Sequence, residues 1–291
     1  MFTPTYNRQK QLSRLYVSLL KQSNYNFIWL IVDDGSIDQT KDIVEQWISS
    51  KPPFEIKYVY KENGGKHSAY NKALEIMNSE WHVTVDSDDW LKEEAISTMY
   101  EKKNAFSEKD KYVGIVFPRL NSKDSNLKVK EWIPDEVDSI NIADIKFKYH
   151  LNIETCILIK NSNLKEFRFP IFSGEKHMSE EPLYNYLAKF GKFYPVPDYI
   201  YVFEYLQDGW TNNLFEIWKK NTKSTLYVLS IRYDYISENY QGILKIKELF
   251  KAKLNINAIK QIQNDPIKDY DIIDFFMSPL SLLWRKFRFK E

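Results

Sequence analysis

A predicted strand that runs directly into a cluster of carboxylates constrains this chain more than any other feature. Residues 81–85 alternate apolar and polar side chains, and Asp-Ser-Asp-Asp follows at once at 86–89. Three acidic groups so close together repel one another unless a cation lies among them. Mg²⁺ and Mn²⁺ favour carboxylate and water ligands, and Mg²⁺ is commonly held by one or two carboxylates plus substrate phosphates. The stretch therefore indicates a divalent metal that holds a diphosphate, although Asp and Ser also gather in solvated turns and helix N-caps.

The first 120 residues or so alternate between strand-like and helix-like patterns. Predicted strands fall at 27–32, 56–60, 81–85 and 113–117, and predicted helices at 12–20, 43–48 and 69–77. This order indicates an α/β fold with an open, mostly parallel sheet flanked by helices. Ligands bind beyond the carboxyl ends of the strands in such sheets, so residues 33–34 and 86–89 are expected at one edge.

The pattern changes after residue 117. Residues 118–150 are polar and predict loops, 154–160 and 199–205 predict strands, and 180–190 predicts a helix. From residue 213 the pattern is helical to about residue 254. We therefore predict a domain over 1–210, with halves at 1–120 and 121–210, and a helical C-terminal region over 211–291.

Composition narrows the function classes. The chain carries 41 Lys and Arg against 40 Asp and Glu, so no global field would recruit nucleic acid. Its one cysteine, Cys156, lies in an apolar run and is expected to be a buried hydrophobe, which is consistent with a reducing compartment. No signal peptide is visible and no apolar run approaches the ~18–20 residues of a membrane span. The expected location is therefore cytoplasmic.

Four motifs stand in a recognisable order along the first half. They are Thr-Pro-Thr-Tyr-Asn-Arg at 3–8, Val-Asp-Asp-Gly-Ser-Ile-Asp at 32–38, Asn-Gly-Gly-Lys at 63–66 with Ala-Tyr-Asn-Lys-Ala at 69–73, and Asp-Ser-Asp-Asp at 86–89. Together they resemble the inverting family-two glycosyltransferases with a GT-A fold, specifically over residues 2–120. The resemblance continues more loosely through residues 174–181 and 204–209, which resemble a bacterial polysaccharide-type subgroup of the family.

The resemblance implies roles for individual residues. The positions implied to bind the nucleotide sugar are Pro4, Thr5, Tyr6, Asp34, Lys66, Asn71, Asp86 and Ser87. Asp88, together with Asp86, is implied to hold the divalent cofactor, Mn²⁺ or Mg²⁺. In the family, the first aspartate of this pair tends toward the ribose and the second toward the metal.

The catalytic base is implied to be Glu180 or its neighbour Glu181. A single in-line displacement at the anomeric carbon needs a carboxylate that takes the proton of the attacking hydroxyl. A helix N-terminus lowers the pKa of such a carboxylate, and an adjacent carboxylate raises it. Both residues also fit the ordinary pattern of acids in a first helical turn.

The resemblance implies transfer of a sugar from a nucleoside-diphosphate sugar, UDP-hexose above all, to a hydroxyl of a glycan or lipid-linked acceptor in surface polysaccharide synthesis. A nucleotidyltransferase with a carboxylate-bound metal is one alternative, but residues 3–8 are not a Gly- and basic-rich phosphate loop. A non-catalytic scaffold that binds sugar nucleotides is the other, and the intact acidic positions argue against it.

The C-terminal residues 275–290 carry a separate signal. Aromatic side chains and leucines alternate there with four cations. This pattern resembles an interfacial anchor, with basic groups for anionic lipid and aromatic rings at the headgroup boundary. A helix that packs on the core or on a second subunit gives the same pattern, so peripheral membrane contact and an oligomer both stay open.

Overall fold

The computed structural model describes residues 1–105, 112–123, 131–204, 213–263 and 272–289, with the backbone alone over 272–276. The chain forms two compact units. The first comprises Met1–Phe169 and Tyr186–Tyr205, and the second comprises Pro170–Asn185 and Leu206–Glu291. The predicted division at residue 210 falls in 205–212, outside the described residues, and stays a prediction.

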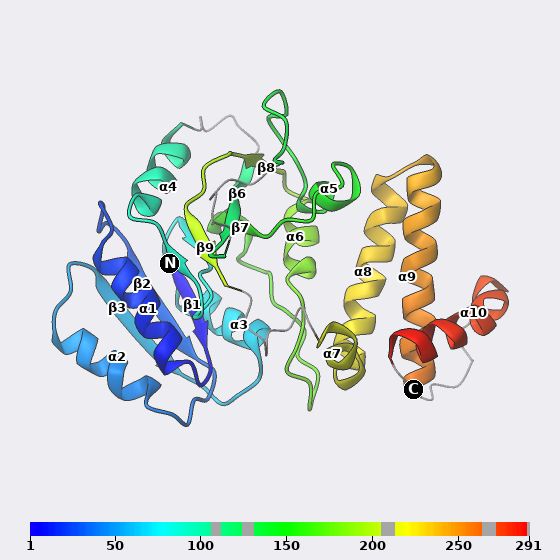
Figure 1. Cartoon of the computed structure of the whole chain (residues 1–291), viewed down its shortest axis with the longest axis horizontal. Helices are drawn as coiled ribbons and strands as arrows, with labels where there is room; N and C mark the ends of the chain where they lie inside the picture. The colour runs from blue at the N-terminus through cyan, green and yellow to red at the C-terminus, as the bar shows by residue number, and fades with distance from the viewer. Residues whose placement is uncertain (106–111, 124–130, 205–212, 264–271, 290–291) are drawn as a thin grey trace. The chain divides into compact units, whose positions relative to one another are not determined.

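Three parallel strands open the first unit (Figure 1). They lie in the order β1 (Phe2–Thr5), β2 (Ile28–Asp33) and β3 (Glu55–Tyr60). β4 (Trp81–Val83) joins them through a parallel bridge between Phe2 and Thr84. All residues of β2 after the first are buried, as a continuous apolar run predicts for a central parallel strand. The predicted parallel sheet is thus present over the first 85 residues.

The rest of the sheet in this unit is mixed. It contains β5 (Trp90–Leu91), β6 (Tyr112–Asn121), β7 (Thr155–Lys160), β8 (Lys192–Pro195) and β9 (Tyr201–Phe203). β7 runs antiparallel to β4 and β6, whereas β8 and β9 run parallel to β6. The structure adds β8, which the sequence analysis did not predict. It also adds α5 (Ile142–Phe147) within the stretch predicted as loops, where a capping box between Asn141 and Asp144 starts the helix.

Helices cover the sheet of the first unit. They are α1 (Gln9–Leu20), α2 (Thr40–Ser49), α3 (Lys66–Ile76) and α4 (Ala95–Asn104). Trp29 of β2 is fully buried, and its ring packs against Tyr16 of α1 and Trp47 of α2, which stack on each other. Cys156 is also buried, and its thiol is free. The predicted α/β fold class and the predicted burial of Cys156 are therefore confirmed.

The second unit is helical. It contains α7 (Leu214–Lys220), α8 (Thr222–Asn239), α9 (Gly242–Ile262) and α10 (Ile272–Arg288), while α6 (Glu181–Leu187) begins in its earlier segment. Leu229 of α8 and Ile256, Ala258 and Ile259 of α9 form its core. The predicted helical pattern extends eight residues beyond residue 254, to Ile262. None of the helices described here combines the length and hydropathy needed to cross a bilayer.

Candidate active site

The carboxyl ends of three parallel strands bring the predicted donor residues to one edge of the sheet. The backbone N–H of Asp34, which follows β2, donates to the carbonyl of Thr5 at 2.8 Å. The N–H of Val85 donates to the carbonyl of Phe2 at 2.9 Å, and Asp86 is the next residue. The ends of β1, β2 and β4 therefore meet, as the order of strands and helices predicts.

Lys66 and Asp86 form the central ion pair of this edge. Lys66 is the first residue of α3, and its Nζ lies 2.6 Å from Asp86 Oδ1. Two residues that the sequence analysis assigned to the nucleotide thus contact each other. The pair places a cation next to the acidic loop 86–89, where a diphosphate would need positive charge.

Asp34 shapes the turn that starts α3. Its carboxylate accepts hydrogen bonds from the backbone N–H groups of Gly64 at 3.0 Å and Gly65 at 2.6 Å, and Lys61 Nζ lies 2.7 Å away. Gly65 has a φ of +89°, which favours glycine. A Cβ at Gly64 would come within 2.7 Å of Ser68 Oγ. Asp34 therefore holds the loop before Lys66, and its contact with a nucleotide stays a prediction.

Arg119 and Tyr201 brace the acidic loop from the other half of the sheet. Arg119 Nη1 lies 3.3 Å from Asp86 Oδ2 and 3.4 Å from Asp89 Oδ2. The guanidinium also stacks over the Tyr201 ring, 4.0 Å from its centroid. The Tyr201 hydroxyl donates to Asp89 at 2.6 Å and accepts from the N–H of Asp86 at 3.0 Å. The sequence analysis assigned a role to neither residue, although an arginine within an apolar strand signals a buried partner.

The three aspartates of the loop differ in their electrostatics. Burial alone would raise the pKa of Asp86, but Lys66 and Arg119 outweigh it and lower that pKa. Burial, reinforced by the negative charge of Asp86, raises the pKa of Asp88 and also that of Asp89. The charged forms of Asp88 and Asp89 are thus less favoured than that of Asp86.

The environment of Asp88 fits a divalent cation. Asp86 already has two cationic neighbours, whereas the raised pKa of Asp88 indicates a carboxylate that a cation would stabilise. Within the described residues, no group of three or more His, Cys, Asp or Glu is arranged to hold a metal unaided. A site of one or two carboxylates completed by substrate phosphates is the common arrangement for Mg²⁺.

Arg14 of α1 supports the backbone of the same loop. Its Nη2 donates to the carbonyl of Asp88, and its Nη1 lies 2.7 Å from Glu204 Oε2. The guanidinium also lies over the ring of Trp90, 4.2 Å from the centroid. An arginine on the first helix therefore fixes the position of Asp88 without touching its carboxylate.

The remaining predicted donor residues divide into two groups. Pro4, Thr5 and Ser87 are buried at the edge, and Tyr6 is 46% exposed. Thr5 Oγ1 is buried and has no hydrogen-bond partner among the described residues, so it is free to bind a ligand. The Asn71 side chain instead exchanges two 2.8 Å hydrogen bonds with the backbone of Phe169, which ties α3 to a residue 98 positions away.

The two candidate bases belong to the second unit and differ in their partners. Glu181 is the first residue of α6, and Arg232 of α8 holds its carboxylate through two hydrogen bonds, one of them 2.8 Å long. Glu180 precedes the helix, and its backbone carbonyl accepts from the N–H groups of Leu183 and Tyr184. Glu181 is therefore committed to an ion pair within its own unit.

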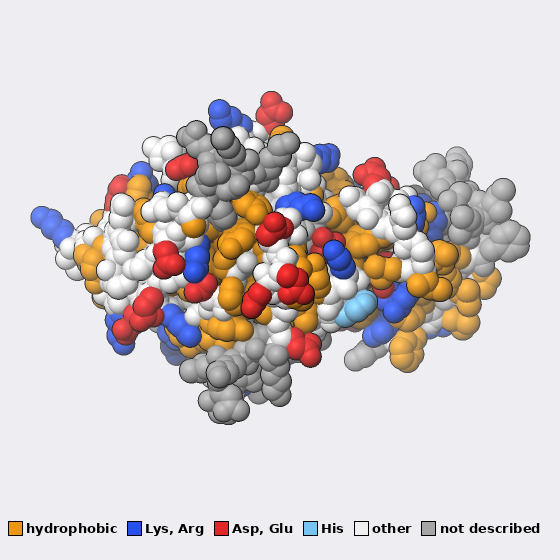
Figure 2. Space-filling view, turned by 90° about the horizontal axis from the view of Figure 1, so that it is seen from above, with side chains coloured by type: hydrophobic (Ala, Val, Ile, Leu, Met, Phe, Trp, Pro, Cys, Tyr) orange, Lys and Arg blue, Asp and Glu red, His pale blue; other side chains and the backbone are white. Residues whose placement is uncertain are grey.

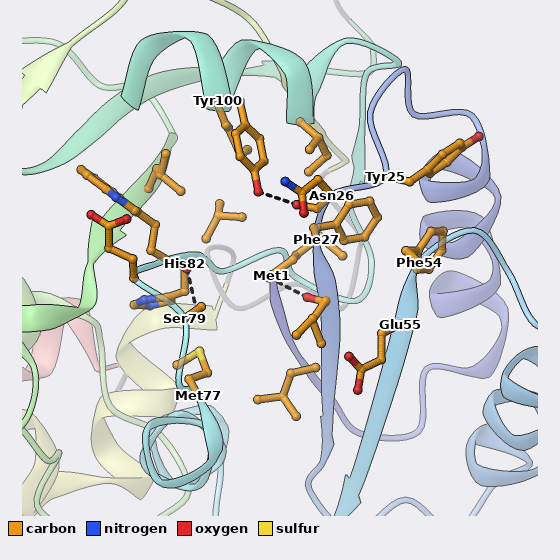
Figure 3. Close-up of a pocket in the computed structure, with 18 of the residues that line it drawn as sticks. Met1, Tyr25, Asn26, Phe27, Phe54, Glu55, Met77, Ser79, His82 and Tyr100 are labelled. Carbon is orange, nitrogen blue, oxygen red and sulfur yellow. Dashed lines mark hydrogen bonds between the residues drawn. The ribbon is translucent and has the colours of Figure 1, made fainter. Parts of the chain in front are cut away.

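A separate pocket of about 460 Å³ opens in the first unit (Figure 3). Its lining includes Met1, Ile28, Glu55 and Trp81, which lie at the amino ends of β1 to β4. Tyr100 closes one side and donates a 2.6 Å hydrogen bond to the carbonyl of Asn26. The acidic loop follows the carboxyl end of β4, so this pocket is not the candidate active site.

Comparison with known proteins decides the family. The model of "Glycosyl transferase family 2" matches residues 1–168, more than half of the chain. The chain belongs to glycosyl transferase family 2. The match covers every strand end that builds the acidic edge, and it confirms the resemblance drawn from the motifs at 3–8, 32–38, 63–73 and 86–89. This family member is therefore a glycosyltransferase.

Two curated relatives show how far the similarity extends. Glycosyltransferase GlyG of Streptococcus pneumoniae is 25% identical over 273 residues, covering 84% of this chain and 88% of GlyG. The poly(ribitol-phosphate) beta-N-acetylglucosaminyltransferase TarS of Staphylococcus aureus is 35% identical over 98 residues, covering 33% of this chain and 17% of TarS.

Solved structures confirm the GT-A type of fold. The crystal structure of S. aureus TarS 1–349 in complex with UDP-GlcNAc has a TM-score of 0.55 at 17% identity and covers 90% of this chain and 82% of that one. The mannosyltransferase PcManGT from Pyrobaculum calidifontis, in complex with GDP-Man and Mn²⁺, has a TM-score of 0.55 at 14% identity and covers 99% and 80%. At these identities the likeness establishes the fold of the glycosyltransferase and leaves its donor open.

Proposed function

We propose that this glycosyltransferase is an inverting, metal-dependent enzyme of surface polysaccharide synthesis. It transfers the hexose of a UDP-hexose donor to a hydroxyl of a glycan or lipid-linked acceptor. The observation that carries the proposal is the acidic loop 86–89 at the carboxyl ends of β1, β2 and β4, with Lys66 beside it. The buried, unpartnered Thr5 Oγ1 at the same edge supports a ligand there. TarS in complex with UDP-GlcNAc supports UDP as the nucleotide.

Asp88 would hold Mn²⁺ or Mg²⁺, and the fold neighbour in complex with Mn²⁺ supports this cofactor. When bound, such an ion neutralises charge on a leaving diphosphate. Asp86 is proposed to orient the nucleotide, because Lys66 and Arg119 hold its carboxylate in place. Lys66 would add positive charge at the phosphates as its pair with Asp86 rearranges.

Glu180 is proposed as the catalytic base. The acceptor oxygen forms a bond to the anomeric carbon as its proton passes to the carboxylate, and the bond to UDP breaks with both electrons on the phosphate oxygen. Glu181 is the poorer candidate because Arg232 binds both of its carboxylate oxygens. Asp86 and Asp88 are proposed to act on the donor, whereas Glu180 acts on the acceptor hydroxyl.

A thermal-shift panel tests the donor. UDP, UDP-GlcNAc, UDP-glucose, GDP-mannose and UTP would each be added with Mn²⁺ and with EDTA. Stabilisation grows with the ratio of ligand concentration to dissociation constant, so the correct UDP-sugar should raise the melting temperature most, and only with metal. Equal shifts for UDP-sugars and GDP-mannose would contradict the assignment of UDP.

A product assay then separates transfer from the nucleotidyltransferase alternative. The proposed enzyme releases UDP from the donor, slowly to water and faster with an acceptor hydroxyl. A nucleotidyltransferase would instead release pyrophosphate from UTP in the presence of a sugar phosphate. Release of pyrophosphate without release of UDP would overturn the proposal.

A further inference from the structure

Helix α10 is packed against α9 through one of its faces. Trp284 Nε1 donates to Asn255 Oδ1 at 2.9 Å, and Gln261 Nε2 donates to Ser281 Oγ at 2.8 Å. Ser281 is fully buried, and Phe289 at the end of the helix is buried in the core of the second unit. The C-terminal segment is therefore an integral part of this unit, with a defined inner face and a defined outer face.

The outer surfaces of α9 and α10 each carry an apolar stripe. The stripe on α9 consists of Ile243, Ile246 and Phe250, exposed at 85%, 68% and 47%. The stripe on α10 consists of Leu280, Leu283 and Phe287, at 51%, 66% and 75%, while Leu282, at 40%, lies outside it. Both sets are spaced by three and then four residues, which places each on one side of its helix. Exposure of six large apolar side chains in two such rows marks an interaction surface.

A groove joins the two stripes. It has a volume of about 300 Å³, and all its lining residues are hydrophobic: Phe250, Leu254, Leu280, Leu283, Trp284 and Phe287. Phe250 belongs to the stripe on α9, Leu280, Leu283 and Phe287 belong to the stripe on α10, and Trp284 adjoins it. The two rows therefore form one continuous apolar surface, which we call the α9–α10 surface.

Exposed basic side chains stand close to the stripe residues along both helices. Helix α9 carries five lysines and one glutamate, and α10 carries three basic residues and one aspartate. Lys247, Lys286 and Arg288 are exposed, and each lies within four residues of a stripe residue on its own helix. Figure 2 shows hydrophobic side chains with lysine and arginine side chains between them over the part of the chain that contains these helices. The surface is thus both apolar and strongly cationic.

We propose that the α9–α10 surface docks on an anionic lipid bilayer, with its apolar stripes at the headgroup boundary and its cations on the lipid phosphates. Apolar area and positive charge together are what such a membrane surface binds. A second copy of the chain fits less well, because a symmetric contact would bring Lys247, Lys286 and Arg288 of both copies together. This assignment goes beyond the transfer reaction and does not depend on the identity of the donor.

Vesicle co-sedimentation of the full chain tests the proposal. The probes are vesicles of phosphatidylcholine alone and of phosphatidylcholine with about one third phosphatidylserine. We expect binding to the anionic vesicles only, weakening as salt is added. Lys286→Glu with Arg288→Glu should lower affinity by at least about fivefold per basic residue, and Leu283→Ser with Phe287→Ser should lower it at every salt concentration.

Matched controls come from α2 of the first unit. Ile48→Ser and Lys41→Glu change exposed residues of the same types and should leave vesicle binding unchanged. Hydrolysis of the soluble donor should be unchanged in all variants, which separates a failure here from a failure of the proposed function. Absent binding, or binding equal on both vesicle types, would overturn the proposal. A dimer in light scattering that Phe287→Ser dissociates, without vesicle binding, would assign the surface to a second copy instead.

Discussion

The Tyr201 hydroxyl donates a 2.6 Å hydrogen bond to the Asp89 carboxylate. The same oxygen accepts from the backbone N–H of Asp86 at 3.0 Å, so one side chain of β9 closes the acidic loop from both ends. Arg119 stacks on the Tyr201 ring and pairs with both carboxylates. Tyr201 is thus positioned to fix the loop geometry on which the proposed metal site depends.

Tyr201→Phe should keep the ring and its stacking on Arg119 but free the loop. We expect unfolding to become easier by about 1–2 kcal/mol, because a buried hydrogen-bonding group loses its partner, and we expect weaker Mn²⁺ binding. Calorimetric titration with Mn²⁺ and UDP measures the second effect. Tyr16→Phe is the control, since the Tyr16 hydroxyl makes one exposed contact of 3.4 Å with Ser50. Unchanged metal affinity would show that the loop does not need Tyr201.

Asp88→Asn should remove the negative charge that the proposed cation binds. We expect at least a tenfold loss of kcat/KM, about 1.4 kcal/mol, and a higher Mn²⁺ requirement in donor hydrolysis. The protein should not lose stability, because burial and Asp86 disfavour the charged form of Asp88 when no cation is bound. Asp42→Asn, at an exposed position of α2, is the control. A wild-type rate and metal dependence in Asp88→Asn would move the metal elsewhere.

Glu180→Gln and Glu181→Gln should have different effects. Glu180→Gln removes proton acceptance, so turnover should fall by roughly 10²–10⁴ while donor affinity stays near wild type. Glu181→Gln should mainly lower stability, by about 1 kcal/mol, through its lost pair with Arg232. Combining it with Arg232→Gln should cost no more than either change alone, because both remove the same interaction. Loss of turnover in Glu181→Gln alone would make Glu181 the base.

His82 should make stability depend on pH. Burial lowers its pKa from 6.5 to about 4. Its Nε2 accepts from the Tyr70 hydroxyl at 2.8 Å and its Nδ1 donates to Asn161 Oδ1, which fits the neutral ring. The hydrogen bond with Asn161 raises the pKa and the charge of the Met1 amino group lowers it, but burial is the largest cause.

As the pH falls, His82 therefore takes up a proton in the unfolded chain before it does so in the folded chain. The contribution of His82 is present above pH 6.5 and is lost as the pH falls toward 4, by roughly 2 kcal/mol between pH 7 and pH 5. Urea unfolding at several pH values should show a smaller slope in His82→Gln. His150→Gln, at an exposed position, should keep the wild-type slope. Equal slopes in all three proteins would contradict the prediction.

Local patterns predicted the parallel part of the fold and the edge where the candidate site lies. The apolar run of β2 and the alternation before Asp86 depend on neighbouring residues, so periodicity alone placed both strand ends. The sequence analysis assigned Lys66 and Asp86 separately to the nucleotide, and their ion pair was found only in the structure. Hydrophobic periodicity is a property of one segment, so it can be used without knowing which distant segments pack together.

The side chains that brace the site could not be predicted in the same way. Arg119 contacts Asp86 across 33 positions, and Tyr201 contacts Asp89 across 112. These contacts exist because β6 pairs with β9, and no periodicity in one segment specifies that pairing. Asn71 shows the same limit, because its two partners both belong to the backbone of Phe169.

The bracing of the acidic loop also makes the candidate site depend on residues far beyond those predicted to bind the donor. A fragment ending at residue 120 would contain all the residues predicted to bind the donor, and Arg119 as well, but it would lack Tyr201 and Glu204. Contacts between residues so far apart close large loops of chain and form slowly. The loop 86–89 can therefore take its final geometry only once β9 has joined β6, so the candidate site depends on the chain as far as Tyr201 and Glu204.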